Sequence, residues 1–253
     1  MSQPTFDADY APRAPWFGGD LQTMAAVLAP PRVSLDDLET EALQLSTLDG
    51  SGDVLTGERL CLPGTGDSAG LERPTVVLLH GMMGDLDRGY MRVLAGAFAR
   101  RGHPVVRMNL RGAGSSRPLC QRNYHAGFTT DLEAVASALA ARPDTGKLAW
   151  IGISLGGNML LKAASESAFI EAADHHRIAS VSAPIDLVAT SKRFSRRRNF
   201  IYSIYMVRKI RRLGPIQPGR TAAEIAHMRR IETIGELDEH FTAPDHGYGS
   251  ANE

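Results

Sequence analysis

Cysteine is scarce in this sequence, and its scarcity excludes two kinds of site. Only Cys61 and Cys120 occur among the 253 residues, and they form no CxxC motif and no Cys/His cluster. A disulfide framework and a zinc site both need more ligands than this, so we expect neither. Two isolated cysteines are typical of free thiols in a reducing compartment, and they predict a cytoplasmic protein.

Charge of one sign and long apolar runs are missing as well. The 28 Lys and Arg residues are balanced by 28 Asp and Glu residues, which gives no bias towards nucleic acid. No stretch approaches the roughly 18 apolar residues of a membrane-spanning helix. Residues 1–15 are polar and lack the apolar core of a signal peptide. We therefore expect no transmembrane segment and no nucleic-acid partner.

The sequence does contain a repeated alternation of strand and helix patterns. Residues 75–79 form a continuous apolar run, which is typical of a strand buried on both faces. Such an alternation predicts an α/β fold with a mostly parallel sheet covered by helices. Thr130 and Glu133 have the spacing of a capping box that opens a helix. The predicted strands are residues 41–47, 54–62, 75–79, 104–108, 148–153 and 178–182, and the main predicted helices are residues 90–101, 130–141 and 155–167.

The length suits one domain with a full core and is too short for two comfortable ones. We expect residues 1–253 to form a single domain. Within it, residues 1–38 form a proline-rich N-terminal extension. The strand–helix alternation ends near residue 187, and residues 187–253 are predicted to form a lid of short helices.

The strongest motif is Gly152-Ile153-Ser154-Leu155-Gly156. It follows a predicted buried strand directly and opens a predicted helix, which is the context that a nucleophile elbow requires. The glycines allow a sharp turn, and the helix N-terminus directs the Leu155 amide at a developing oxyanion. Ser154 is therefore the predicted catalytic nucleophile. The alternative is a glycine-rich strand–helix junction with an incidental serine.

A second motif, His80-Gly81-Met82-Met83-Gly84, follows the buried strand at residues 75–79. In folds with a nucleophile elbow, the loop after the third strand supplies the other oxyanion donor. We predict that the backbone N–H of Met82 is this donor, together with the N–H of Leu155. His80 is predicted to pack the loop rather than to act as the base, because the loop faces the nucleophile with backbone groups.

Several motifs in order resemble the YheT-like family of α/β-hydrolases. The resemblance runs from about residue 16 to the last residues, and it implies the α/β-hydrolase fold, a serine esterase or lipase activity on small-molecule esters or lipids, and no cofactor. Asp20 stands where the HLQT element of the family has histidine. The matching segments are Asp20-Leu21-Gln22-Thr23, His80 to Gly84, Tyr90-Met91-Arg92, Asn109 to Gly114, Tyr124-His125-Ala126-Gly127, Gly152 to Asn158, Ser182 to Leu187 and Phe241-Thr242-Ala243-Pro244.

The rest of the triad is the main departure from the family. The family takes its acid and histidine from loops after two further strands, beyond the element at Phe241–Pro244, and residue 253 lies only nine residues past Pro244. We therefore expect a chain that is truncated at its C-terminus, lacks the last strands, has the 178–182 strand as an edge, and has impaired activity. The rival hypothesis is a non-catalytic fragment or pseudoenzyme that at most binds a ligand. Residues that could substitute are Asp186 as the acid and His125, His227, His240 or His246 as the base.

Two further features allow a ligand but favour a simpler interpretation. His175 and His176 follow Asp174, but adjacent histidines do not readily face one ion, so no metal is predicted. The stretch from Lys192 to Arg212 has nine basic residues, no acidic residue, and interleaved aromatic side chains. It is compatible with weak contact with an anionic membrane. The simpler interpretation is a lid with a solvated basic face.

Overall fold

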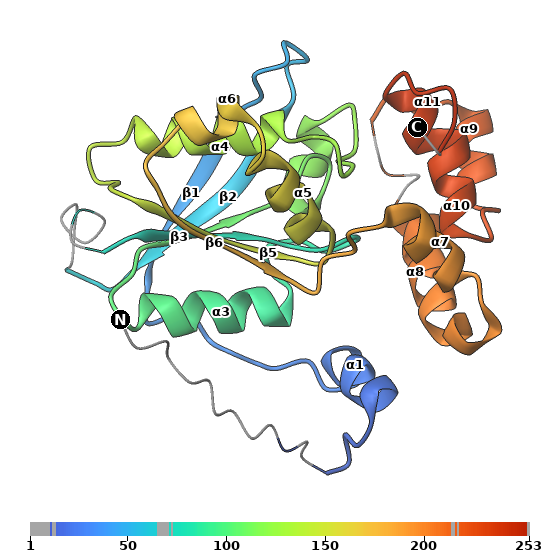
Figure 1. The fold of residues 1–253 in the computed structure, drawn as a ribbon, viewed down its shortest axis with the longest axis horizontal. Coiled ribbons are helices and arrows are strands. Elements are labelled where there is room, and N and C mark those ends of the chain that lie inside the picture. Colours follow the sequence, from blue (N-terminus) through green and yellow to red (C-terminus); the bar gives the residue numbers. More distant parts are fainter. Residues whose placement is uncertain are drawn as a thin grey trace.

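A six-stranded mixed sheet forms the centre of the described protein (Figure 1). The computed structural model describes residues 11, 14–64, 71, 73–213, 216 and 218–251. The strand order is β1-β2-β4-β3-β5-β6, in which β2 is antiparallel to both β1 and β4, and β4, β3, β5 and β6 are parallel. The strands are β1 (Glu39–Ser46), β2 (Val54–Cys61), β3 (Thr75–Leu79), β4 (Val105–Met108), β5 (Leu148–Ile153) and β6 (His175–Val181).

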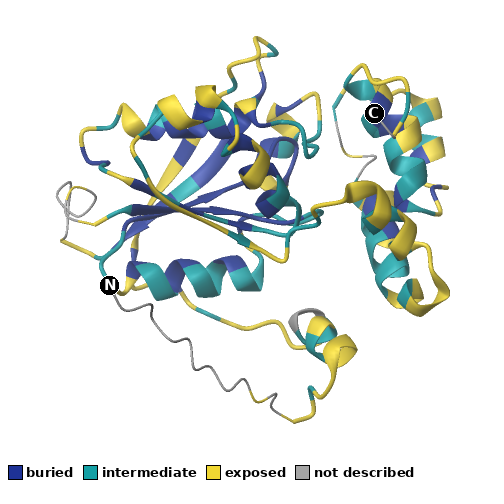
Figure 2. Ribbon diagram, in the orientation of Figure 1, coloured by how far each residue is buried: buried dark blue, intermediate teal, exposed yellow. Residues whose placement is uncertain are grey.

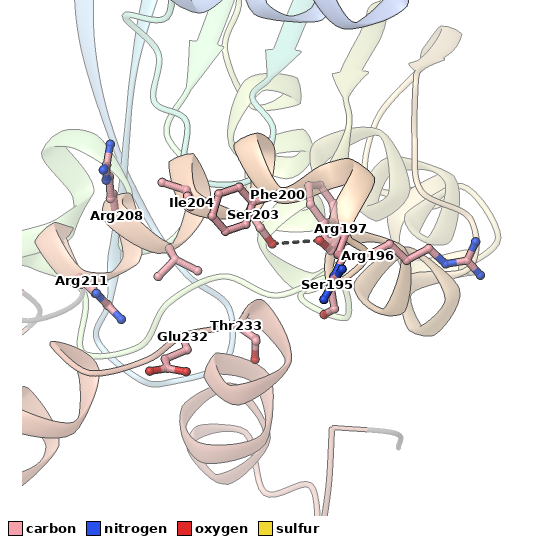
Figure 3. Close-up of a pocket in the computed structure, with 12 residues that line it drawn as sticks. Ser195, Arg196, Arg197, Phe200, Ser203, Ile204, Arg208, Arg211, Glu232 and Thr233 are labelled. Carbon is pink, nitrogen blue, oxygen red and sulfur yellow. Dashed lines mark hydrogen bonds between the residues drawn. The ribbon is translucent and has the colours of Figure 1, made fainter.

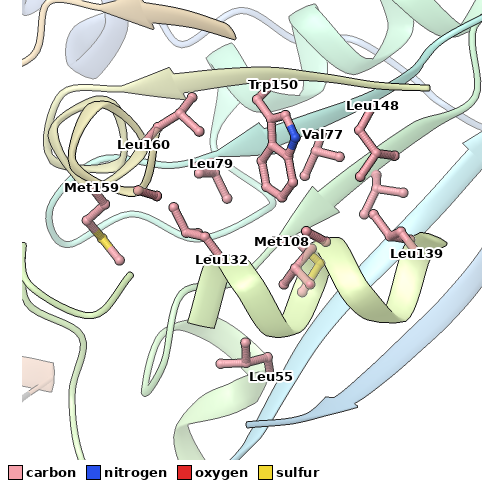
Figure 4. Packing of buried hydrophobic residues seen from close by; sticks show 14 of the residues in the cluster. Leu55, Val77, Leu79, Met108, Leu132, Leu139, Leu148, Trp150, Met159 and Leu160 are labelled. Carbon is pink, nitrogen blue, oxygen red and sulfur yellow. The ribbon is translucent and has the colours of Figure 1, made fainter. Parts of the chain in front are cut away.

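Helices cover both faces of this sheet, as the alternation predicted. Helix α3 (Gly89–Ala99) lies on one face, and α4 (Thr130–Ala140), α5 (Leu155–Ala163) and α6 (Ser167–Glu171) lie on the other (Figure 1). All five residues of β3 are buried, because successive side chains supply the two apolar clusters on opposite faces of the sheet. Figure 4 shows Val77, Leu79 and Trp150 of the sheet packed against Leu132 of α4 and Met159 of α5.

Most predicted elements are confirmed, with shifts at their ends. Strand β5 has the predicted bounds, whereas the predicted helix at 155–167 is divided into α5 and α6 by a turn at Ala164 and Ser165. The prediction of a capping box at Thr130 and Glu133 is wrong. Helix α4 begins at Thr130 itself, and the preceding Thr129 directs its hydroxyl to the Gly127 carbonyl instead of to a helix amide. The favoured spacing was present, but the helix begins at a different residue.

Strand β6 is the edge of the described sheet, and its side chains are more exposed than those of the inner strands. It pairs with β5 alone among the described strands. Ile178 is 38% exposed and Val181 is 44% exposed. The predicted strand at 178–182 begins three residues earlier than expected, at His175. The exposure of β6 contrasts with β3 and β4, in which every residue is buried.

Residues 187–251 add only helical elements in the part of this segment that the structure describes (Figure 1). An apolar cluster of Ile210, Met228, Ile231, Ile234 and Phe241 holds them together, and the partly buried Met82 and Met83 of the loop after β3 pack against it. Figure 2 shows that the outer surface of these helices is largely exposed. The elements are α7 (Leu187–Phe194), η3 (Arg197–Asn199), α8 (Phe200–Leu213), α9 (Ala222–Met228), α10 (Ile234–Leu237), η5 (Asp238–Thr242) and α11 (Ala243–Asp245).

Candidate active site

Ser154 lies at the turn between β5 and α5 in a strained backbone conformation. Its φ of 53° and ψ of −120° are values that side-chain-bearing residues rarely adopt. A Cβ atom on Gly152 would lie 2.5 Å from the Gly156 carbonyl oxygen, and one on Gly156 would lie 2.5 Å from the His80 carbonyl oxygen. The two glycines of the motif are therefore required by close backbone packing. A sharp strand–turn–helix with a strained serine at its apex is the geometry that a nucleophile elbow requires.

The strain at Ser154 predicts an unusual ranking of two substitutions. Ser154→Gly should be more stable than Ser154→Ala by about 1–2 kcal/mol, because glycine relieves about 1–3 kcal/mol of strain and loses about 0.5–1 kcal/mol of backbone entropy. Thermal melting of both variants measures this difference. At Ser137, in the middle of α4, the ranking should be reversed, since glycine is the poorer helix residue there. Equal stability of the two variants at position 154 would contradict a strained elbow.

The loop after β3 lies directly against the elbow. A Cβ atom on Gly81 would lie 2.9 Å from the Ser154 Cβ and 3.5 Å from its Oγ. Two tyrosines hold this loop: the Gly81 N–H donates to the Tyr90 hydroxyl at 3.0 Å, and the Met83 N–H donates to the Tyr124 hydroxyl at 2.6 Å. Burial raises the pKa of Tyr124 to about 12, so its hydroxyl is neutral near pH 7. The Met82 N–H between them has no hydrogen-bond partner among the described residues.

His80 is engaged entirely within this loop, in line with the packing role predicted for it. It is fully buried, and its Nδ1 lies 2.8 Å from the Gly81 carbonyl oxygen while its Nε2 accepts from the Leu110 N–H at 3.1 Å. These partners require the tautomer with hydrogen on Nδ1. Burial lowers the pKa of His80 to about 4. The ring is therefore neutral near pH 7 and has no free nitrogen for the Ser154 proton.

A cavity of about 950 Å³ opens over the elbow and the loop. Ser154, Leu155 and Met82 line it, so all three residues predicted for the nucleophile and oxyanion hole meet at one cavity. The helices of residues 187–251 form its other wall, with Met206 and Ile210 of α8 among the lining side chains. Lys209 of α8 donates to the Met83 carbonyl oxygen at 2.6 Å, which anchors that wall to the loop after β3.

Two of the four candidate histidine bases lie at this cavity. His125 and His246 both line it, and their ring centroids are 4.2 Å apart. Burial lowers the pKa of His125 to about 4 and also lowers the pKa of His246. His125 Nδ1 accepts from the Gly127 N–H at 3.1 Å. Among the described residues, neither ring is hydrogen-bonded to Ser154.

The remaining candidates lie elsewhere. His227 and His240 contact each other with ring centroids 4.9 Å apart, and neither lines the cavity. Asp186 is the N-cap of α7 and accepts from the Ala189 N–H at 2.8 Å, so its carboxylate is engaged in capping that helix. His175 is held by the Trp150 Nε1–H at 3.0 Å and the Phe169 carbonyl at 2.8 Å. Within the described residues, no group of three His, Cys, Asp or Glu side chains is arranged to hold a metal ion.

Sequence reasoning missed the parts of the site that depend on tertiary contacts. Tyr90 and Tyr124 occur in two of the motifs, but nothing in those motifs indicates that their hydroxyls hold the loop after β3. It also missed the buried Arg111, which stacks on Phe128 with its guanidinium carbon 4.2 Å from the ring centre. Phe128 in turn contacts His125 with ring centroids 4.6 Å apart. Arg111 therefore supports one side of the cavity.

Comparison with known proteins identifies the fold and its relatives. Residues 74–192 match the model of the α/β hydrolase fold family. The chain is 30% identical over 183 residues to "Putative esterase YheT" of Escherichia coli (strain K12), covering 71% of this chain and 53% of that protein. It is 25% identical over 193 residues to the human "Phospholipase ABHD3" and 25% identical over 194 residues to the "Monoacylglycerol lipase" of Saccharomyces cerevisiae, covering 72% of this chain in both cases.

A solved structure shares the same fold. The esterase Pf2001 of Pyrococcus furiosus superimposes with a TM-score of 0.53 at 19% identity, covering 72% of this chain and 71% of that one. The α/β-hydrolase fold predicted from the motifs is therefore confirmed. The chain spans about half the length of the curated relatives it matches, with 44% of the human protein and 42% of the yeast protein covered.

Proposed function

We propose that Ser154 is the nucleophile of a carboxylic ester hydrolase of esterase or lipase type, in a chain that has the α/β-hydrolase fold and is similar in sequence to YheT of Escherichia coli. One observation carries the proposal. The strained Ser154 lies against Gly81, at a cavity that Met82 and Leu155 also line. A serine, two backbone donors and a cavity are parts that acyl transfer requires on the enzyme side, in addition to a base for the serine proton.

The proposed reaction is acyl transfer from an ester to water. Ser154 Oγ attacks the carbonyl carbon, and the carbonyl oxygen becomes an oxyanion that accepts from the N–H groups of Met82 and Leu155. The proton that leaves Ser154 must reach a base and then the departing alcohol, after which water hydrolyses the acyl-serine. The N–H groups of Gly81 and Met83 already donate to the hydroxyls of Tyr90 and Tyr124. The Met82 N–H between them is therefore the one donor of the three that is left for the substrate.

We propose a small-molecule ester or lipid as the substrate. The cavity of about 950 Å³ is at the upper end of the usual range for ligand sites, about 300–1,000 Å³. Methionines and aliphatic side chains of residues 187–251 form part of its wall, and we propose that this segment is a lid on a single domain. The names of the relatives point the same way, because they include an esterase, a phospholipase and a monoacylglycerol lipase.

The cellular location that we propose is the cytoplasm. Cys61 and Cys120 are both buried and unpaired, which is the usual state of cysteine in a reducing compartment. No helix in the described part of the chain combines the length and the apolar character that crossing a bilayer demands.

We propose that residues 1–253 on their own turn over esters only weakly. Ser154 has no histidine partner among the described residues. Both ring nitrogens of His80, which precedes Gly81 in the loop after β3, are hydrogen-bonded to backbone groups. An oxyanion hole without its base and acid retains about 10³–10⁴-fold rate enhancement, some 10⁶-fold less than a complete triad. The competing hypothesis is a protein that binds a ligand in the same cavity without hydrolysing it.

Hydrolysis of short-chain p-nitrophenyl esters by the purified chain separates these outcomes. We expect a slow rate that exceeds the buffer rate but is only slightly above that of Ser154→Ala, because the residual enhancement comes from the oxyanion hole and substrate binding. Both proteins should be equally folded by circular dichroism. A rate no higher than the buffer rate in both proteins would overturn the proposed oxyanion hole and favour the ligand-binding hypothesis. Fast, Ser154-dependent turnover would show instead that an internal residue, with His125 and His246 the first candidates, acts as the base.

A further inference from the structure

The hairpin of α7, η3 and α8 concentrates positive charge on a chain whose charges balance overall. The chain has a formal net charge of +0, but the stretch from Lys192 to Arg212 has nine basic residues and no acidic one. All nine except Lys209 are exposed. The hairpin is therefore a strongly cationic surface that an anionic partner would complement.

Exposed apolar side chains lie at the same end of the hairpin as three consecutive arginines. Phe200 is 62% exposed and Ile201 is 63% exposed, and they follow Arg196, Arg197 and Arg198 almost directly. Large apolar side chains exposed side by side favour a partner that removes them from water. Arginines beside them favour a partner with negative charge around an apolar interior.

Helix α1 (Gly19–Leu28) extends this apolar surface. Its Asp20 accepts from the Tyr202 hydroxyl at 3.0 Å and pairs with Arg198 at 3.2 Å, so α1 lies against the start of α8. The neighbouring Phe17 and Leu21 are 59% and 46% exposed. Two segments that are far apart in the sequence thus present apolar side chains next to the cationic tip of the hairpin, which we define as Arg196–Arg198.

A pocket of about 490 Å³ opens beside this tip (Figure 3). Its apolar lining comes from aromatic and aliphatic side chains of the hairpin, and one carboxylate, Glu232, lies on the opposite side. Four guanidinium groups belong to its lining, so the pocket combines an apolar interior with cationic edges. The hairpin residues that give the pocket this character are Phe200, Ile204 and the arginines Arg196, Arg197, Arg208 and Arg211.

Helix α8 connects this surface to the cavity over Ser154. Its Met206 and Ile210 line that cavity, whereas Ile204, Arg208 and Arg211 line the outer pocket. Lys209 of the same helix is bound to the Met83 carbonyl oxygen at 2.6 Å, beside the proposed oxyanion donor. A partner on the outer face of α8 would therefore be one helix away from the site proposed for ester chemistry.

We propose that the α7–α8 hairpin, together with α1, docks the protein on the surface of an anionic lipid bilayer. Arginines at the tip contact the headgroups, and Phe200, Ile201, Phe17 and Leu21 enter the boundary between headgroups and acyl chains. Two exposed aliphatic residues distinguish this surface from a single-stranded RNA site, where aromatic rings stack on bases. The delivery of lipid to Ser154 rests on the proposed function, whereas the docking itself does not.

Vesicle co-sedimentation tests the docking without any catalysis. The full chain with Ser154→Ala is mixed with phosphatidylcholine vesicles that contain or lack phosphatidylglycerol. We expect binding only to the phosphatidylglycerol vesicles, reduced at high salt. Arg196→Gln with Arg197→Gln should lower partitioning about 30-fold, since each basic residue near an anionic surface contributes about one kcal/mol. Phe200→Ser should lower it further at high salt, where only the apolar contribution remains.

A matched control removes two exposed charges that lie outside the α7–α8 hairpin and α1. Arg101→Gln with Arg177→Gln changes the net charge equally and should leave partitioning unchanged. Equal loss in this control, binding to pure phosphatidylcholine at the same strength, or tighter binding to a single-stranded RNA oligonucleotide would overturn the proposal. Because hydrolysis of soluble p-nitrophenyl esters does not need a bilayer, failure of docking and failure of the proposed ester chemistry give different results.

Discussion

Replacing Arg111 by methionine should lower the free energy of unfolding by about 3–5 kcal/mol, the usual cost of removing one partner from a buried ion pair. The Arg111 side chain is fully buried and binds three carboxylates. Its Nη1 lies 2.9 Å from both Asp49 Oδ2 and Asp53 Oδ2, and its Nε and Nη2 form a bidentate pair with Asp131. Methionine would keep the aliphatic contacts but leave the buried carboxylates without a cation.

Urea unfolding of Arg111→Met measures this loss, and Arg100→Met provides the control. Arg100 also makes a bidentate pair, with Asp37, but both side chains are exposed, at 41% and 53%. The loss there should be below about 1 kcal/mol. Losses of similar size in both variants would show that the buried Arg111 network contributes no more to the free energy of unfolding than the exposed Arg100–Asp37 pair. Arg111→Lys should recover only part of the stability, because lysine lacks the planar guanidinium that binds a carboxylate through two hydrogen bonds.

Gly156→Ala should destabilise the protein by about 3 kcal/mol or more, at the upper end of the usual cost of overpacking. The added Cβ would meet the His80 carbonyl oxygen at 2.5 Å and the Leu79 carbonyl oxygen at 3.0 Å. Both neighbours are backbone atoms of β3 and the loop that follows it, so they cannot move aside as a side chain could. The helix must instead move away from β3, and the Leu155 amide moves with it.

Gly235→Ala is the matched control for this substitution. Gly235 lies in helix α10, and a Cβ atom there would have its nearest neighbour at 3.7 Å, an ordinary contact. Because alanine is the better helix residue, Gly235→Ala should be neutral or stabilising by up to about 1 kcal/mol. Thermal melting of both variants gives the comparison. A Gly156→Ala protein as stable as Gly235→Ala would rule out the tight junction of α5 with β3.

The elbow could be predicted from the sequence because its signals are local. Ser154 follows an apolar strand and precedes a helix, and these two patterns together specify a strand–turn–helix around Gly152 and Gly156. The loop at His80 could be predicted for the same reason, since it ends the buried run of β3. In both cases neighbouring residues in the chain determine the conformation.

The partners of these residues could not be predicted, because they come from distant segments. Tyr124 reaches the Met83 amide from the loop after β4, and His246 reaches His125 from the position just after α11. No periodicity or spacing relates such positions until the sheet brings them together. The capping box fails for a related reason: Thr130 and Glu133 have the right spacing, but the chain before α4 turns so that Thr129 is the N-cap. A true capping box occurs at Thr221 and Glu224 of α9.

The most direct test of Ser154 as the nucleophile is to locate the site of reaction with a fluorophosphonate. Trypsin should release residues 148–162 as one peptide, and Ser154 is its only serine. We predict slow incorporation of one phosphonyl group into this peptide, and none into the peptide from Ser154→Ala. A peptide that stays unmodified after prolonged incubation, or label that falls on another serine and persists in Ser154→Ala, would contradict the central claim that Ser154 is the nucleophile and faces an oxyanion hole.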